Sequence, residues 1–150
     1  MIFLDWLKDF APIVTAIGVG VAAVQLWNTK RQAVTTFEDS LASEYRQITA
    51  KLPTSALLGE VLSSDLLKVH LPEFYLYFDL CNTQIFLRQR RRVSRQTWRF
   101  WADGIRTNLS RPAFAAAWTD IGRRSNRDFS ELRRCIAEGF MIDPRKWPKE

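Results

Sequence analysis

Residues 10–27 read FAPIVTAIGVGVAAVQLW, a stretch of 18 residues that contains no charged side chain. A helix of that length measures roughly 27 Å, close to the roughly 30 Å of hydrocarbon in a bilayer. Trp6 and Trp27 bracket the stretch, as aromatic side chains do at the two surfaces of a membrane. The sequence therefore predicts a single transmembrane helix over residues 10–28, preceded by an interfacial N-terminus.

The flanks of this helix predict its orientation. Lys30 and Arg31 follow it directly, whereas residues 1–9 carry two aspartates against one lysine. Because cytoplasmic flanks are enriched in Lys and Arg, we expect the N-terminus outside and the C-terminal domain in the cytoplasm, at a bacterial-type inner membrane. A cleaved signal peptide is the alternative, but the acidic N-terminus and the lack of a small-x-small cleavage site argue against it.

Small residues spaced by four along the predicted membrane helix indicate a helix–helix contact. Small side chains at this spacing let two membrane helices approach closely. The residues expected at such a contact are Ala16, Gly18, Gly20 and Ala22. They favour either a homo-oligomer or a protein partner within a membrane complex.

Beyond the membrane helix, apolar residues recur at steps of three and four, which is typical of amphipathic helices. No alternating pattern indicates a strand, so the fold class predicted for residues 29–142 is an all-α bundle of about five to six helices. We expect residues 143–150 to form an irregular tail. The predicted helices are one that ends at Pro53, one or two short ones within 54–71, an apolar one from Pro72, and three more over about 95–108, 111–123 and 126–138.

Capping residues mark several of these boundaries. Ser94 and Ser110 are each placed to cap the N-terminus of the helix that follows. Gly139 is placed to end the last helix. Beyond its first turn, the most apolar helix contains a single acid, Asp79. Because an unpaired buried carboxylate is costly, we expect Asp79 either to pair with an arginine such as Arg99 or to reach the surface.

Positive charge is concentrated in the second half of the chain. Residues 1–79 carry 6 Lys or Arg against 9 Asp or Glu, a net charge of −3, whereas residues 80–150 carry 16 against 7, a net charge of +9. Six arginines fall within twelve residues, and we call them the arginine cluster: Arg88, Arg90, Arg91, Arg92, Arg95 and Arg99. Cations near a helix C-terminus explain part of such a cluster, and the excess indicates an anionic partner.

Catalytic chemistry is not indicated. The sequence contains no nucleophile elbow, phosphate loop, dinucleotide fingerprint or zinc-ligand spacing, so we expect neither an enzyme nor a cofactor or metal. Cys81 and Cys135 are interpreted as reduced thiols in the core, and His70, the single histidine, as structural. Trp98 and Trp101 have the spacing of core residues rather than of exposed platforms for nucleic-acid bases.

Residues 77–118 read YFDLCNTQIFLRQRRRVSRQTWRFWADGIRTNLSRPAFAAAW. The aromatic helix, basic turn, Trp-x-x-Trp helix and Pro-x-Phe-x-x-x-Trp helix of this segment resemble a family of small, uncharacterised bacterial proteins that have one N-terminal membrane span and a helical cytoplasmic domain. The resemblance implies the fold and the anchoring but no activity.

These features predict a non-enzymatic membrane-anchored interaction protein, an accessory or scaffold subunit of a larger membrane complex. The alternative is a regulatory or stress-response module whose arginine-rich face binds nucleic acid or anionic lipid, and whose binding weakens steeply with salt.

Overall fold

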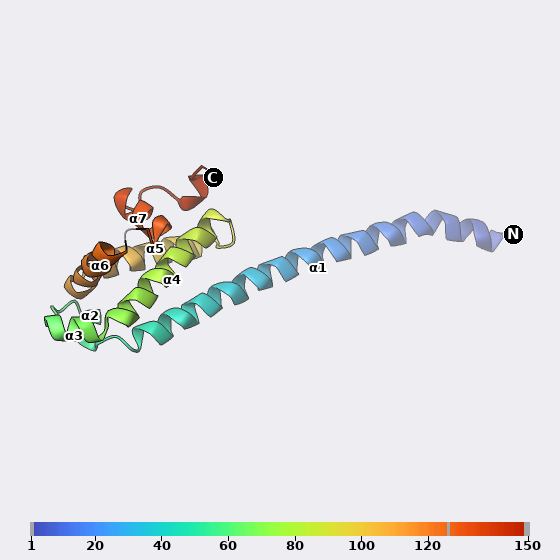
Figure 1. Cartoon of the computed structure of the whole chain (residues 1–150). Coiled ribbons are helices and arrows are strands. Elements are labelled where there is room, and N and C mark those ends of the chain that lie inside the picture. The colour runs from blue at the N-terminus through green and yellow to red at the C-terminus, as the bar shows by residue number, and fades with distance from the viewer. Residues whose placement is uncertain (1, 126, 149–150) are drawn as a thin grey trace. The chain divides into compact units, whose positions relative to one another are not determined.

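A computed structural model describes the backbone of residues 2–125 and 127–148, and the side chains of that part from residue 21 onward. Within these residues the structure is all-helical, with no strand (Figure 1), which confirms the predicted fold class at that level. The elements are α1 (Ile2–Thr49), α2 (Thr54–Leu57), α3 (Ser64–Val69), α4 (Leu71–Gln89), α5 (Arg95–Ser110), α6 (Pro112–Arg124), α7 (Ser130–Ala137) and the 3-10 helix η1 (Pro144–Lys146).

The chain divides into two compact units, residues 1–37 and residues 38–150, and α1 contributes to both. In the first unit the described side chains of residues 21–36 are all exposed in this chain. No described helix is both long and apolar enough to cross a bilayer. The predicted interfacial N-terminus and the predicted contact residues Ala16, Gly18 and Gly20 lie outside the described side chains, and Ala22 is exposed.

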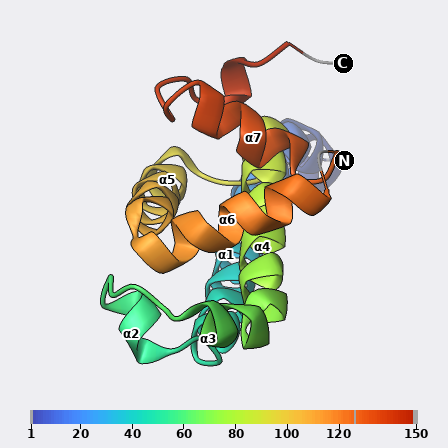
Figure 2. The same ribbon diagram turned by 60° about the vertical axis from the view of Figure 1, so that its left-hand side comes forward.

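Helix α4 is the central element of the second unit. It packs against α3, α5, α6, α7 and η1 (Figure 2). Its buried aromatic side chains meet those of neighbouring helices edge to face: Phe74 lies 5.1 Å from Phe114, and Phe78 lies 5.0 Å from Trp118, between ring centroids. Such pairs stabilise a core beyond the area they bury. The helix predicted to be the most apolar is therefore the core of the bundle.

Of the two predicted N-terminal helix caps, one is confirmed and the other is wrong. The side chain of Ser94 accepts a hydrogen bond from the backbone N–H of Thr97 at 3.1 Å, so it caps α5 as expected. Ser110 instead belongs to the last turn of α5, and Arg111 is the residue that precedes α6. The cause is Pro112, which disfavours helical angles in the residue before it and so moves the boundary to Arg111, whose φ is −74° and ψ is 138°.

Helix α7 begins later than its predicted start at residue 126. Residues 127–129 are not helical, and Phe129 adopts a left-handed conformation with φ 62°. Since Phe129 offers no capping side chain, the cap comes from α4: Asn82 Oδ1 accepts a hydrogen bond from the Leu132 N–H at 3.0 Å. The predicted end of this helix is confirmed, because Gly139 takes the left-handed angles of a Schellman motif after α7.

The C-terminal tail is more ordered than the irregular segment that the sequence suggests. Residues 144–146 form η1, and Pro144 and Trp147 are buried. The indole N–H of Trp147 donates to Glu138 at 2.8 Å, and the Arg134 guanidinium lies 4.3 Å from the centroid of the same ring. The tail therefore packs on the bundle.

Several single-residue expectations are also resolved. Asp79 is exposed, which is the second of its two predicted outcomes. Cys81 and Cys135 are buried free thiols, as interpreted from the sequence. Trp98 and Trp101 are buried, so neither forms an exposed stacking platform.

Candidate anion-binding site

The turn after α4 presents the arginine cluster through a strained backbone. The Arg91 N–H donates to the Arg88 carbonyl at 3.0 Å, and the Arg92 N–H donates to the Leu87 carbonyl at 2.9 Å, which together form a Schellman motif. The left-handed residue of this motif is Arg91, with φ 61°. Glycine is the usual residue at such a position because it has no Cβ, so the chain carries a charged side chain here against its conformational preference.

Arg88 does not belong to the solvent-facing part of the cluster. Its side chain is only 2% exposed, and its Nη1 donates to the Val93 carbonyl at 2.8 Å. Its Nε and Nη2 both donate to the carboxylate of Asp143. Arg88 therefore closes the turn and holds the tail, whereas the sequence placed it among the residues that meet an anionic partner.

The start of α5 is fixed by a carboxylate from α1. Glu38 Oε1 accepts a hydrogen bond from the Ser94 N–H at 2.7 Å, and Glu38 Oε2 accepts one from the Thr97 hydroxyl at 2.6 Å. A carboxylate at this place also interacts favourably with the helix dipole. Because α5 is held at its first turn, Arg95 and Arg99, four residues apart, lie on one face of a well-positioned helix.

These segments enclose a depression of about 690 Å³. Four of its cations come from the arginine cluster, one of them the buried Arg88, and two come from η1, which the sequence did not associate with the cluster. We call this site the basic depression, and its lining residues are Arg88, Arg91, Arg95, Trp98, Arg99, Phe140, Met141, Asp143, Arg145 and Lys146.

The cations at the rim of the basic depression lack acidic partners. Among the described residues, the one carboxylate that lines the site, Asp143, is paired with the buried Arg88. No ion pair joins any of the other five cations to an acid in that part of the chain: Arg91, Arg95, Arg99, Arg145 and Lys146. By contrast, Arg106, Arg124 and Arg134 each pair with an acid three or four residues away in the chain. The site therefore concentrates uncompensated positive charge.

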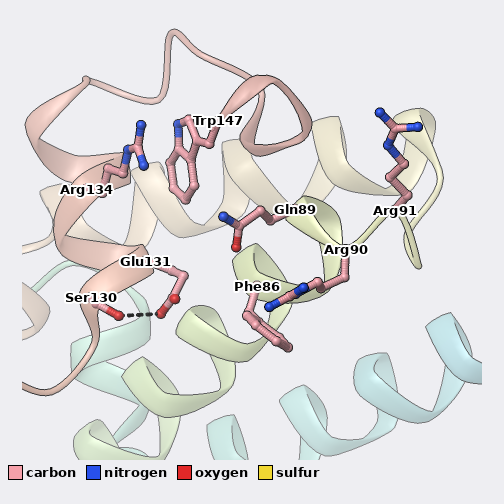
Figure 3. Close-up of a pocket in the computed structure, with 8 residues that line it drawn as sticks. All are labelled: Phe86, Gln89, Arg90, Arg91, Ser130, Glu131, Arg134 and Trp147. Carbon is pink, nitrogen blue, oxygen red and sulfur yellow. Dashed lines mark hydrogen bonds between the residues drawn. The ribbon is translucent and has the colours of Figure 1, made fainter. Parts of the chain in front are cut away.

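The remaining two members of the arginine cluster lie elsewhere. Arg90 stacks on Phe86, with its guanidinium carbon 5.1 Å from the ring centroid, at the edge of a second depression of about 430 Å³ (Figure 3). That depression also contains Glu131, which accepts a hydrogen bond from the Ser130 hydroxyl at 2.7 Å. Arg92 is exposed and lines neither of these two depressions. The predicted cluster therefore does not form one site, and Arg91 lines both depressions.

The chemistry of the basic depression is that of anion recognition. Guanidinium groups present fixed pairs of donors that match carboxylate and phosphate oxygens, and Arg95 and Arg99 present two such groups side by side. Burial raises the pKa of the Cys135 thiol to about 12 and that of Cys81 to about 12, so neither supplies a thiolate nucleophile near neutral pH. Among the described residues, the site offers binding groups and no general base beyond the paired Asp143.

The resemblance carried by residues 77–118 stays a prediction. No protein-family model matches the chain, and neither the curated proteins nor the solved structures gave a match.

Proposed function

We propose that this chain is a non-enzymatic, membrane-anchored interaction protein that docks on an acidic surface of a larger membrane complex through the basic depression. The observation that carries the proposal is the convergence of five exposed cations from three segments on one depression without acidic partners. Uncompensated charge of one sign both steers and orients an oppositely charged partner. The apolar side chains of Met141 and Phe140 in the same site add contact area.

Anchoring is proposed from the uncharged residues 10–27, with the N-terminus outside and the helical domain in the cytoplasm at a bacterial inner membrane. Carbonate extraction of membranes tests the anchor, since an inserted helix stays in the pellet at high pH. Release of the full-length chain into the supernatant would contradict it. Protease protection of an epitope tag at each end then tests the orientation.

Docking is tested by crosslinking in intact membranes at native expression. The variant Arg95→Glu/Arg99→Glu reverses two charges in the basic depression, and we expect it to abolish a specific crosslinked species. The matched control is Arg106→Glu/Arg123→Glu, which reverses two exposed charges outside the depression. Equal crosslinking by both variants would show that the basic depression is not the docking site.

Anionic lipid is a second candidate partner, favoured by one specific observation. Met141 and Ile142 are 84% and 44% exposed and precede Arg145 and Lys146 by three to five residues in the chain. Exposed apolar side chains beside cations are typical of segments that lie on a membrane surface. This reading predicts that Ile142→Ser, at an exposed residue that does not line the basic depression, weakens binding to vesicles containing phosphatidylglycerol while leaving the protein crosslink intact. Nucleic acid receives less support, because Trp98 and Trp101 are buried.

A further inference from the structure

A separate cavity of about 280 Å³ lies within the second unit, between the last turns of α1, the middle of α4 and α5. It is lined mainly by apolar and aromatic groups, including Trp101 and the exposed ring of Phe100. An apolar cavity of about 150 Å³ holds a benzene molecule, so this one has room for a ring with a short side chain. It shares no lining residue with the basic depression.

Gln84 gives this cavity a polar group. Its side chain is 4% exposed and lines the cavity, yet its amide makes no hydrogen bond within the described part of the chain. The amide is not shut off from solvent, since the fully buried polar atoms without a partner in the described residues are His70 Nδ1 and Glu73 Oε2. Its neighbour Tyr77 differs, because the Tyr77 hydroxyl accepts a hydrogen bond from Asn108 at 2.8 Å. The Gln84 amide is therefore available to a molecule in the cavity.

Gly104 keeps the α5 side of the cavity open. It lies in the interior of α5, where glycine is about 1 kcal/mol less favourable than alanine. A Cβ built at this position would meet no atom within 4 Å, so no close packing requires glycine there. At Gly122 in α6, by contrast, an added Cβ would touch the Arg133 side chain at 3.8 Å. The absent side chain of Gly104 leaves space in the cavity that any larger residue would occupy.

Arg46 supplies a cation at the rim. It is exposed, lines the cavity, and forms no ion pair with a described residue. A site with apolar walls, one buried amide and one guanidinium at its edge matches a ligand with an apolar body and an anionic head. We propose that the cavity binds a small amphipathic carboxylate, whose body packs on Trp101 and whose carboxylate meets Arg46 and the Gln84 amide.

The test uses the full-length chain in lipid nanodiscs and 3-(4-fluorophenyl)propionate as the probe, followed by ¹⁹F NMR. We expect saturable broadening of the probe signal beyond that produced by empty nanodiscs. Gly104→Leu should weaken binding at least tenfold, because the leucine side chain fills the cavity. Ala115→Leu, an exposed substitution on α6, serves as the matched control and should leave binding unchanged.

The head group is tested separately. Arg46→Gln should weaken binding of the carboxylate at least fivefold. Binding of the corresponding alcohol, 3-(4-fluorophenyl)propanol, should stay within twofold of its affinity for the unaltered chain.

Circular dichroism melts confirm that each variant folds, and Gly104→Ala provides a milder change that also improves helix propensity. Absence of saturable binding, or equal affinity of Gly104→Leu and the unaltered chain, would overturn the proposal. Equal loss of both probes in Arg46→Gln would overturn the assignment of a carboxylate.

Discussion

Arg88 and Asp143, 55 positions apart in the chain, are joined by two parallel hydrogen bonds, from Nε to Oδ1 at 2.9 Å and from Nη2 to Oδ2 at 2.5 Å. The guanidinium is almost fully buried, whereas the carboxylate is 24% exposed. Asp143 also accepts the Arg145 N–H at 3.0 Å and so caps η1. This pair fixes both the turn after α4 and the segment that brings two more cations to the basic depression.

Replacing Asp143 by alanine leaves the Arg88 cation buried without its partner. Removing one member of a buried ion pair usually lowers the free energy of unfolding by about 3–5 kcal/mol, and the partial exposure of Asp143 places the expected loss near about 3 kcal/mol. Urea unfolding measures it. Asp103→Ala removes the exposed pair with Arg106 and should change stability by less than about 1 kcal/mol. A loss of similar size in both variants would contradict this account.

The same pair predicts how stability depends on pH. Partial burial alone would raise the pKa of Asp143. Hydrogen bonds from the Arg88 side chain and the Arg145 N–H, together with the positive charge of Arg88, outweigh this effect of burial. They hold the pKa of Asp143 below its usual 3.8. A carboxyl with a lowered pKa in the folded state binds its proton more weakly than in the unfolded state. Its stabilisation is therefore complete above the unfolded-state pKa and is lost as the pH falls below it.

We accordingly expect the stability difference between the unaltered chain and Asp143→Asn to be constant from about pH 5 to pH 7 and to shrink below about pH 4. Urea unfolding at stepped pH measures this difference. A difference that grows on acidification would show that Asp143 is not stabilised as a carboxylate by Arg88.

The periodic apolar pattern was sufficient to predict the longer helices of the second unit, because each of them buries one face. Phe74, Phe78 and Phe114 all lie in the core on the faces that their spacing indicated. Boundaries were predicted correctly where one local cap decides them, as at Ser94 and Gly139. Boundaries were missed where a residue of another segment or a proline sets them. Asn82 of α4 caps the start of α7, and Pro112 sets the start of α6.

The candidate site was predicted only in part, for a similar reason. Local sequence showed a dense run of arginines, but it could not show that Arg88 turns inward to a carboxylate 55 positions away. Nor did it associate Arg145 and Lys146 with the cluster, since that proximity depends on Trp147 packing on α7. The one available signal was Trp147 itself, a large aromatic residue in a tail that is rich in charged residues and proline.

The two thiols should be inert in the folded chain. The pKa of about 12 for Cys81 and for Cys135 leaves almost no thiolate at neutral pH. We expect reaction with 5,5′-dithiobis(2-nitrobenzoic acid) to be at least a hundredfold slower than in 6 M guanidinium chloride, in which both sites react. Rapid labelling of either thiol under native conditions would show that its segment opens readily.

Asn82→Ala should loosen α7 in particular. The substitution removes the acceptor for the Leu132 N–H, which then lacks its partner in the first turn of the helix. Loss of a helix cap usually lowers stability by about 1–2 kcal/mol. Hydrogen exchange should accelerate in α7 more than in α5. Thr83→Ala, an exposed neighbour, is the control and should leave exchange unchanged.

Arg91→Gly should separate stability from binding. Because Arg91 holds a left-handed conformation that glycine adopts without strain, the substitution should raise the free energy of unfolding by about 1 kcal/mol. It also removes a cation that lines the basic depression, so affinity for an acidic partner or an anionic vesicle should fall. Arg92→Gly is the matched control, since Arg92 has an ordinary φ and does not line the basic depression. A variant at position 91 that is more stable and binds as well as the unaltered chain would remove Arg91 from the site.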